Sequence, residues 1–138
     1  MQKEKIIGNR GEAVARDFLR KKGLKFVAQN YHAQGGEIDL IFFDLLKNEY
    51  VMVEVKTRSN DAFGGGAESI TPGKFEKILS AAEDFFFKKL ECEEMPFFRI
   101  DAVIVDVDGE RFFCEHIEDI GFDDFQIPQD SWNEKYFG

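Results

Sequence analysis

Acidic residues interrupt two short apolar segments of the chain, and the second segment also carries a lysine. The segments read Gly36-Glu37-Ile38-Asp39-Leu40-Ile41 and Val53-Glu54-Val55-Lys56-Thr57-Arg58. Successive side chains of a β-strand alternate between its two faces, so Glu54 and Lys56 should point the same way. Because an unpaired carboxylate is costly to bury, we expect Asp39 and Glu54 to share a purpose. A hard divalent cation, which takes oxygen ligands, is the natural one.

The order of these segments resembles a known set of motifs. An Asp followed, after a hairpin, by Glu-x-Lys is similar to the PD-(D/E)xK nuclease superfamily. Together with Gly11-Glu12-Ala13-Val14-Ala15 and the later Arg99-Ile100-Asp101-Ala102-Val103, the set resembles the YraN-like family of bacterial proteins. That family is related in fold to the archaeal-type Holliday junction resolvases. The resemblance covers residues 5 to 118 and is more specific for fold and family than for activity.

The resemblance implies an α/β fold with a restriction-endonuclease-like three-layer core, in which helices flank a mixed β-sheet. It also implies a metal-dependent, endonuclease-like hydrolase that cleaves phosphodiester bonds of DNA, with branched DNA as one candidate substrate and a homodimer as the assembly. One or two Mg²⁺ or Mn²⁺ ions would be held by Asp39, Glu54 and the backbone carbonyl of Val55. The catalytic set would add Glu12 to this acidic cluster and Lys56 as the group that steers or deprotonates the attacking water.

Basic residues near the expected site are candidates for phosphate binding. Lys74 and Lys77 lie in the first turns of a helix that Thr71 and Pro72 should begin. Cations near a helix N-terminus are disfavoured by roughly 0.3–1 kcal/mol, and a nearby anion would remove that cost. We therefore predict phosphate contacts for Lys74, Lys77 and Arg58, with two ordinary solvated lysines as the alternative.

Each candidate also has a simpler interpretation. Glu54 and Lys56 could form a surface ion pair on an edge strand, worth about 0–1 kcal/mol. Glu12 could be a solvated helix residue paired with Arg16 four positions later. His32, a single histidine in a polar loop, is interpreted as a surface or packing residue.

Two other functions stay open for the whole chain. It could be a non-catalytic module that binds nucleic acid or protein through the same fold, or an acidic structural protein with an internal network of salt bridges. The intact set of two acids and a lysine argues against the binding module. A site that has lost catalytic activity has no physical need to keep a buried cluster of charges.

The elements that position these residues follow from hydrophobic periodicity and turn residues. An amphipathic helix is predicted over residues 3–22, ended by Gly23, and a second helix begins at Pro72. Val51, Val53 and Val55 should face helices, and Arg99 and Asp101 should pair. Strands are predicted over residues 24–31, 37–43, 50–57, 97–105 and 111–117, the last after the turn signal Asp108-Gly109.

Length indicates one compact unit, in which residues 1–118 form the nuclease-like α/β domain and residues 119–138 an acidic, aromatic C-terminal extension. Disordered acidic tails generally lack aromatic residues. Because this extension is rich in them, we expect residues 122–132 to pack on the domain, on a second copy or on a protein partner, with a flexible terminus as the alternative.

The net charge of -9 is the main objection to a nucleic-acid partner, since such proteins usually carry a basic surface. The charge is uneven, however. Residues 1–25 carry eight basic and three acidic residues, whereas residues 83–138 carry five and sixteen. The expected site therefore lies in the part of the chain that is closest to neutral or basic.

The chain has no apolar run near the ~20 residues that a membrane-spanning helix needs. Its N-terminus shows no apolar core of a signal peptide, so a cytoplasmic location is expected. In that compartment Cys92 and Cys114 should be free thiols.

Overall fold

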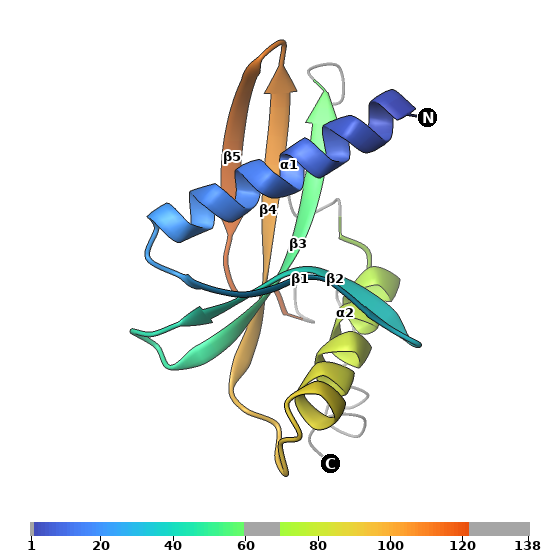
Figure 1. Cartoon of the computed structure of the whole chain (residues 1–138), viewed down its shortest axis with the longest axis vertical. Helices are drawn as coiled ribbons and strands as arrows, with labels where there is room; N and C mark the ends of the chain where they lie inside the picture. The colour runs from blue at the N-terminus through green and yellow to red at the C-terminus, as the bar shows by residue number, and fades with distance from the viewer. Residues whose placement is uncertain (1, 60–69, 122–138) are drawn as a thin grey trace.

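The computed structural model describes residues 2–59 and 70–121, and every structural statement below concerns those residues (Figure 1). The predicted packing of residues 122–132 lies outside them. The elements are α1 (Gln2–Lys21), β1 (Lys25–Ala33), β2 (Gly36–Asp44), β3 (Glu49–Ser59), α2 (Pro72–Asp84), the π-helical turn η2 (Phe85–Lys89), β4 (Phe98–Asp108) and β5 (Arg111–Ile117).

The five strands form one mixed sheet in the order β1-β2-β3-β4-β5. Neighbouring strands are antiparallel except β3 and β4, which run parallel. A parallel pair needs a crossover connection, and the segment that contains α2 supplies it. The mixed sheet implied by the motif resemblance is therefore confirmed.

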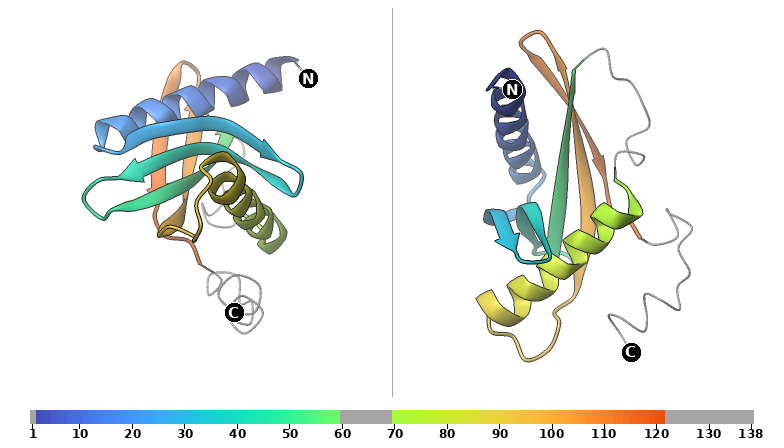
Figure 2. Two further views of the ribbon diagram at one scale, coloured as in Figure 1. Left: turned by 60° about the horizontal axis from the view of Figure 1, so that its bottom comes forward. Right: turned by 90° about the vertical axis from the view of Figure 1, so that its right-hand side faces the viewer.

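Helix α1 lies on one face of the sheet and α2 lies on the other, which gives three layers (Figure 2). The alternation of side chains along β3 shows how the sequence specifies both faces. Val51 and Val53 pack with Ala15 and Leu19 of α1, whereas Met52 belongs to the cluster under α2. The α/β three-layer core is confirmed, and it agrees with a restriction-endonuclease-like fold.

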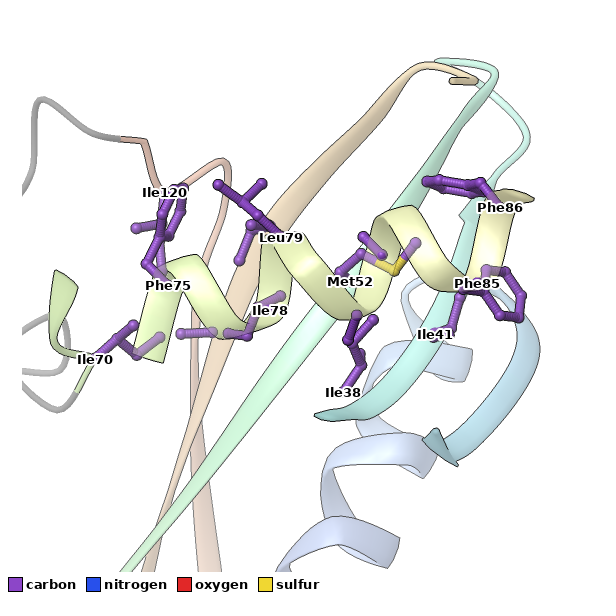
Figure 3. Close-up of a cluster of buried hydrophobic side chains, with 14 residues drawn as sticks. Ile38, Ile41, Met52, Ile70, Phe75, Ile78, Leu79, Phe85, Phe86 and Ile120 are labelled. Atoms are coloured by element: carbon purple, nitrogen blue, oxygen red, sulfur yellow. The ribbon is translucent and has the colours of Figure 1, made fainter. Parts of the chain in front are cut away.

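The layer between the sheet and α2 consists of large aliphatic and aromatic side chains (Figure 3). Fully burying one such side chain contributes about 1.5–3 kcal/mol, so this cluster holds α2 firmly in place over β2 and β3. Its largest members are Ile38, Ile41, Met52, Ile70, Phe75, Ile78, Leu79, Phe85, Phe86 and Ile120.

The helix boundaries agree with their local signals. Gly23 follows α1 with φ +98°, a left-handed conformation that glycine adopts without steric cost. Pro72 is the first residue of α2, and the Thr71 hydroxyl accepts a hydrogen bond from the backbone N–H of Lys74 at 3.1 Å. The predicted N-cap at Thr71 is thus confirmed.

Two local features differ from the prediction. The turn between β4 and β5 consists of Gly109 and Glu110, with Asp108 paired to Arg111, so it lies one residue later than Asp108-Gly109. Gly109 takes φ +63°, which explains why the glycine sits at the first turn position. In addition, α2 continues as the π-helical turn η2, a local widening that no sequence pattern indicated.

The chain beyond β5 returns to the core. The backbone N–H of Ile120 donates to the carbonyl of Ile100 at 2.7 Å, and the Ile120 side chain is buried under α2. The first residues of the predicted C-terminal extension are therefore in contact with the domain. None of the described helices has the length and apolar character needed to cross a membrane.

Candidate functional site

The candidate site begins where β2 and β3 separate. Their antiparallel ladder reaches the pair Leu40 and Val53, and beyond it the Asp39 carboxylate accepts the backbone N–H of Val55 at 2.8 Å. A side chain thus takes the place of a backbone acceptor at this end of the pairing. Burial raises the pKa of the Asp39 carboxyl, and the hydrogen bond from Val55 and the charge of Lys74 oppose that rise.

Glu54 is the most unusual residue of the site. It is only 8% exposed, and one carboxylate oxygen, Oε1, lies 3.1 Å from the Lys74 ammonium. The other oxygen, Oε2, is buried and receives no hydrogen bond from a described residue, and when Glu54 carries a proton its carboxyl donates a hydrogen bond to Asp39. Burial raises the Glu54 pKa to about 7; the charge of Asp39 acts in the same direction, and Lys74 acts against both. The two carboxyls are therefore held together at an electrostatic cost.

Two glycines let α2 approach close enough to place Lys74 on Glu54. A Cβ atom added to Gly36 would lie 2.2 Å from the backbone oxygen of Lys77, and one added to Gly35 would lie 2.3 Å from the Ser80 hydroxyl. A larger residue at Gly36 would push α2 away from the β1–β2 turn, because the atom that it would meet belongs to the helix backbone. The Gly-Gly pair before Glu37 thus has a packing role that follows from the tertiary contact.

Another glycine brings α1 near the same carboxylates. A Cβ atom on Gly11 would lie 2.0 Å from the Thr57 hydroxyl oxygen of β3. The next residue, Glu12, is partly buried, and its pKa is raised by burial and then by the charges of Asp39 and Glu37. Glu12 therefore lies within electrostatic reach of Asp39.

The simpler interpretation of Glu12 was a surface ion pair with Arg16, but Arg16 has a different partner. Its guanidinium instead donates to the Gln29 side-chain oxygen on β1 at 2.6 Å. Arg16 therefore does not make the predicted pair with Glu12.

The predicted basic residues lie in different environments. Lys56 is exposed, and it makes no hydrogen bond or ion pair with any residue that the structure describes. Arg58 forms a two-point ion pair with Asp106 on β4, with N···O distances of 2.9 and 3.2 Å. Lys77 is exposed at the second turn of α2. Of the predicted cations, Lys74 is the one that contacts a predicted site carboxylate.

A second cluster of charges lies around the start of β4. The predicted pair of Arg99 and Asp101 is confirmed, with Arg99 Nε 3.0 and 3.2 Å from the two Asp101 oxygens. Sequence reasoning did not include His116, whose Nε2 lies 2.7 Å from Asp101. The β4–β5 hairpin register, which pairs Val103 with His116, was the signal that could have found it. Arg99 also binds Asp44 and Glu49, each at 2.9 Å.

Asp101, His116 and Glu118 offer ligand atoms within 4.8 Å of one another, so this group could bind a metal. The Asp101 carboxylate, however, already accepts hydrogen bonds from Arg99, His116 and the backbone N–H of Asp119. These bonds, together with the charge of Arg99, lower its pKa although burial acts to raise it. As it stands, the cluster is a satisfied ion-pair network, in contrast to the unpartnered oxygen of Glu54.

Comparison with known proteins agrees with the motifs. Residues 11–105 match the uncharacterised protein family UPF0102. A UPF0102 protein of Marinomonas sp. (strain MWYL1) is 38% identical over 110 residues, which cover 80% of this chain and 81% of the relative. A UPF0102 protein of Ralstonia pickettii (strain 12J) is 40% identical over 102 residues, covering 72% and 79%.

A third relative, from Photorhabdus laumondii, is 39% identical over 107 residues and covers 78% of this chain and 82% of its own length. The region matched by the family includes the carboxylates Glu12, Asp39 and Glu54 and the two lysines Lys56 and Lys74. The chain therefore belongs to the UPF0102 family, the YraN-like family that its motifs resemble.

Proposed function

We propose that this protein is a divalent-metal-dependent hydrolase of phosphodiester bonds, with DNA as its substrate class. The observation that carries the proposal is the pair Asp39 and Glu54, in which Glu54 Oε2 is buried and receives no hydrogen bond from a described residue. A buried carboxylate oxygen without a donor is costly unless a cation or a proton meets it.

The residues around the pair suit a hard cation. Asp39 and Glu54 supply carboxylate oxygens, the Val55 carbonyl is a candidate third ligand, and Glu12 can add a further acid directly or through water. Lys74 already places a positive charge against Glu54, which supports the view that this position favours a cation. When bound, Mg²⁺ or Mn²⁺ would lower the pKa of a coordinated water and offset charge on the phosphate oxygens.

The two lysines have separate roles in this proposal. Lys56 lies on the same face of β3 as Glu54, and its exposed ammonium can reach a phosphate oxygen or the attacking water. Lys74 lies at the rim of the pair and neutralises part of its charge. Removing one cation that contacts the transition state costs on the order of 10²-fold in rate.

The second candidate is a module of the same fold that binds nucleic acid or protein without catalysis. The net charge of -9 favours the protein-binding form of this module, since each phosphate contact of a nucleic-acid binder needs a basic partner. A branched substrate, a homodimer and a protein partner for the C-terminal extension are proposals that rest on the motif resemblance and on composition.

Calorimetric titration of Mn²⁺ into the wild-type protein tests the metal site. We expect one or two ions to bind and to raise the melting temperature through linkage. Asp39→Asn and Glu54→Gln should abolish both effects, whereas Glu83→Gln, an exposed acid on α2, should leave them intact. Equal metal-induced shifts in all four proteins would contradict the site.

Nicking of linear and branched DNA in the presence of Mn²⁺ tests the activity. The wild type should cleave, and Lys56→Ala and Asp39→Asn should lose about 10²-fold or more in rate. Cleavage that survives both changes would come from a contaminant or from another site. Metal binding without cleavage of any DNA or RNA form would favour the binding module.

A further inference from the structure

A cavity of about 370 Å³ adjoins the carboxylate pair, between the β1–β2 turn and the first turns of α2. On the strand side it is lined by the β1–β2 turn, in which Ala33, Gly35 and Gly36 are small. Its polar side chains come from both elements: His32, Gln34, Glu37, Lys74 and Lys77.

The polar groups of this cavity are mostly hydrogen-bond donors. Lys74 and Lys77 bring two ammonium groups, and Gln34 brings an amide. Glu37 is the one acid of the lining, and its carboxylate lies 3.1 Å from the His32 ring nitrogen, which faces it across the hairpin. A ligand in the cavity therefore meets two cations and an acid that already has a partner.

A phosphate group fits this set of donors. Its oxygens accept hydrogen bonds from ammonium and amide groups, and charge-assisted bonds of this kind are the stronger ones. The N-cap of α2 does not contribute, since the Lys74 backbone N–H already donates to Thr71.

Lys74 belongs to both sites. Its side chain lines the cavity, and its ammonium lies 3.1 Å from Glu54 Oε1. Without another cation, the carboxylate pair holds this ammonium by charge. A divalent ion on Asp39 and Glu54 would neutralise the pair and release Lys74 toward the cavity.

We propose that this cavity binds a phosphate group and that Lys74 couples its occupancy to cation binding at Asp39 and Glu54. The coupling, unlike the phosphate site itself, rests on the metal site of the proposed function. Because linkage is reciprocal, each ligand strengthens the binding of the other by the same factor, typically about 5- to 150-fold. The phosphate belongs either to a nucleic-acid strand that passes the carboxylates or to a free nucleotide.

The phosphate site is tested in EDTA, so that the metal site plays no part. Thymidine 3′,5′-bisphosphate is titrated into wild type and Lys77→Ala, with binding followed by calorimetry or NMR. Lys77→Ala should weaken binding roughly fivefold or more, because a charge-assisted contact is lost. Lys89→Ala removes the same charge from an exposed position on η2 outside the cavity and should have little effect. Equal losses for Lys77→Ala and Lys89→Ala would overturn the phosphate site.

The coupling is tested by repeating the titration with Mn²⁺. Wild type should gain affinity for the bisphosphate by about fivefold or more, and Lys74→Ala should gain clearly less. Any direct contact between metal and phosphate is common to both proteins, so the difference reports Lys74. Equal gains in the two proteins overturn the coupling.

Failure of the coupling and failure of the proposed function give different results. If calorimetry shows no Mn²⁺ binding to wild type, the metal site and the coupling both fall, and the EDTA titrations alone decide the phosphate site. If Mn²⁺ binds but adds no bisphosphate affinity, only the coupling falls.

A short single-stranded phosphorothioate oligonucleotide identifies the source of the phosphate. Equal losses for the oligonucleotide and the bisphosphate in Lys77→Ala support a strand in the cavity. A loss confined to the bisphosphate supports a site for a free nucleotide.

Discussion

At the scale of single residues, the protein buries two carboxylates, Asp101 and Glu54, in different electrostatic environments. Asp101 is fully buried and is surrounded by donors, so its pKa falls below the ordinary value. Glu54 is also buried, but it has one lysine and a neighbouring carboxylate, so its pKa rises to about 7. The first arrangement stabilises the folded protein at neutral pH, whereas the second leaves charge that a ligand can compensate.

The raised pKa of Glu54 predicts how the metal-free protein responds to pH. Between the ordinary pKa of 4.5 and about 7, the folded state holds a proton that the unfolded state has lost. The free energy of unfolding should therefore fall as pH rises through this range, by roughly 3 kcal/mol if the full shift applies. Glu54→Gln, which cannot ionise, should lack this decrease.

Urea denaturation in EDTA at several pH values measures this difference. The control is Glu83→Gln, whose stability should follow the wild type at each pH. Parallel curves for wild type and Glu54→Gln would show that Glu54 titrates normally in the folded protein.

At the scale of elements, the site depends on how closely two helices approach the sheet. Gly11 allows α1 to contact Thr57, and Gly36 allows α2 to contact the β1–β2 turn through the Lys77 backbone. These contacts bring Glu12 and Lys74 toward the carboxylates that β2 and β3 carry. The helices thus add to a site that the two strands begin.

Gly36→Ala tests the approach of α2. The added Cβ would lie 2.2 Å from a backbone oxygen, which cannot move without shifting the helix. Overpacking of this kind costs roughly 1–3 kcal/mol, occasionally more. We expect a lower midpoint of urea denaturation and tighter Mn²⁺ binding, since the Lys74 ammonium that competes for Glu54 moves away from the pair.

Gly73→Ala is the matched control on the same helix. A Cβ atom there meets no atom within 4 Å, and alanine favours helix over glycine by up to about 1 kcal/mol. Gly73→Ala should be neutral or stabilising. Similar destabilisation by both substitutions would mean that helix propensity, rather than contact with Gly36, decides the effect.

At the scale of the whole molecule, charge is distributed unevenly along the chain. Most of the excess acid lies in residues 83–138, away in sequence from the residues of the candidate site. The core includes Ile120, whose side chain is buried under α2. A truncation that probes the acidic end should therefore keep residues 1–121 rather than stop at residue 118.

Removing residues 122–138 takes away four acidic residues and one lysine. If these charges compete with nucleic acid for the basic residues of α1, truncation should raise nucleic-acid affinity, and more at low than at high salt. Fluorescence anisotropy with labelled DNA at two salt concentrations measures this. Lower stability with unchanged affinity would instead indicate that the segment is held against the domain.

The sequence by itself determined the features that depend on near neighbours. Alternation along residues 51–55 predicted that the valine face of the strand packs on a helix, and Thr71 and Gly23 predicted a helix start and a helix end. The short hairpin between β2 and β3 made the proximity of Asp39 and Glu54 predictable as well. These signals act over a few residues, so no knowledge of distant contacts was needed.

Only the tertiary structure decided which charges meet. Lys74 lies against Glu54, Arg58 against Asp106, and His116 against Asp101, and each partner comes from a different element. Helical or strand periodicity says which face a side chain occupies, but it does not say which element covers that face or at what register. The element that covers each face, and its register, follow from the packing of α1 and α2 on opposite sides of one sheet. This packing explains why Asp101 lies in a satisfied salt-bridge network, whereas Asp39 and Glu54 form a pair that a cation would stabilise.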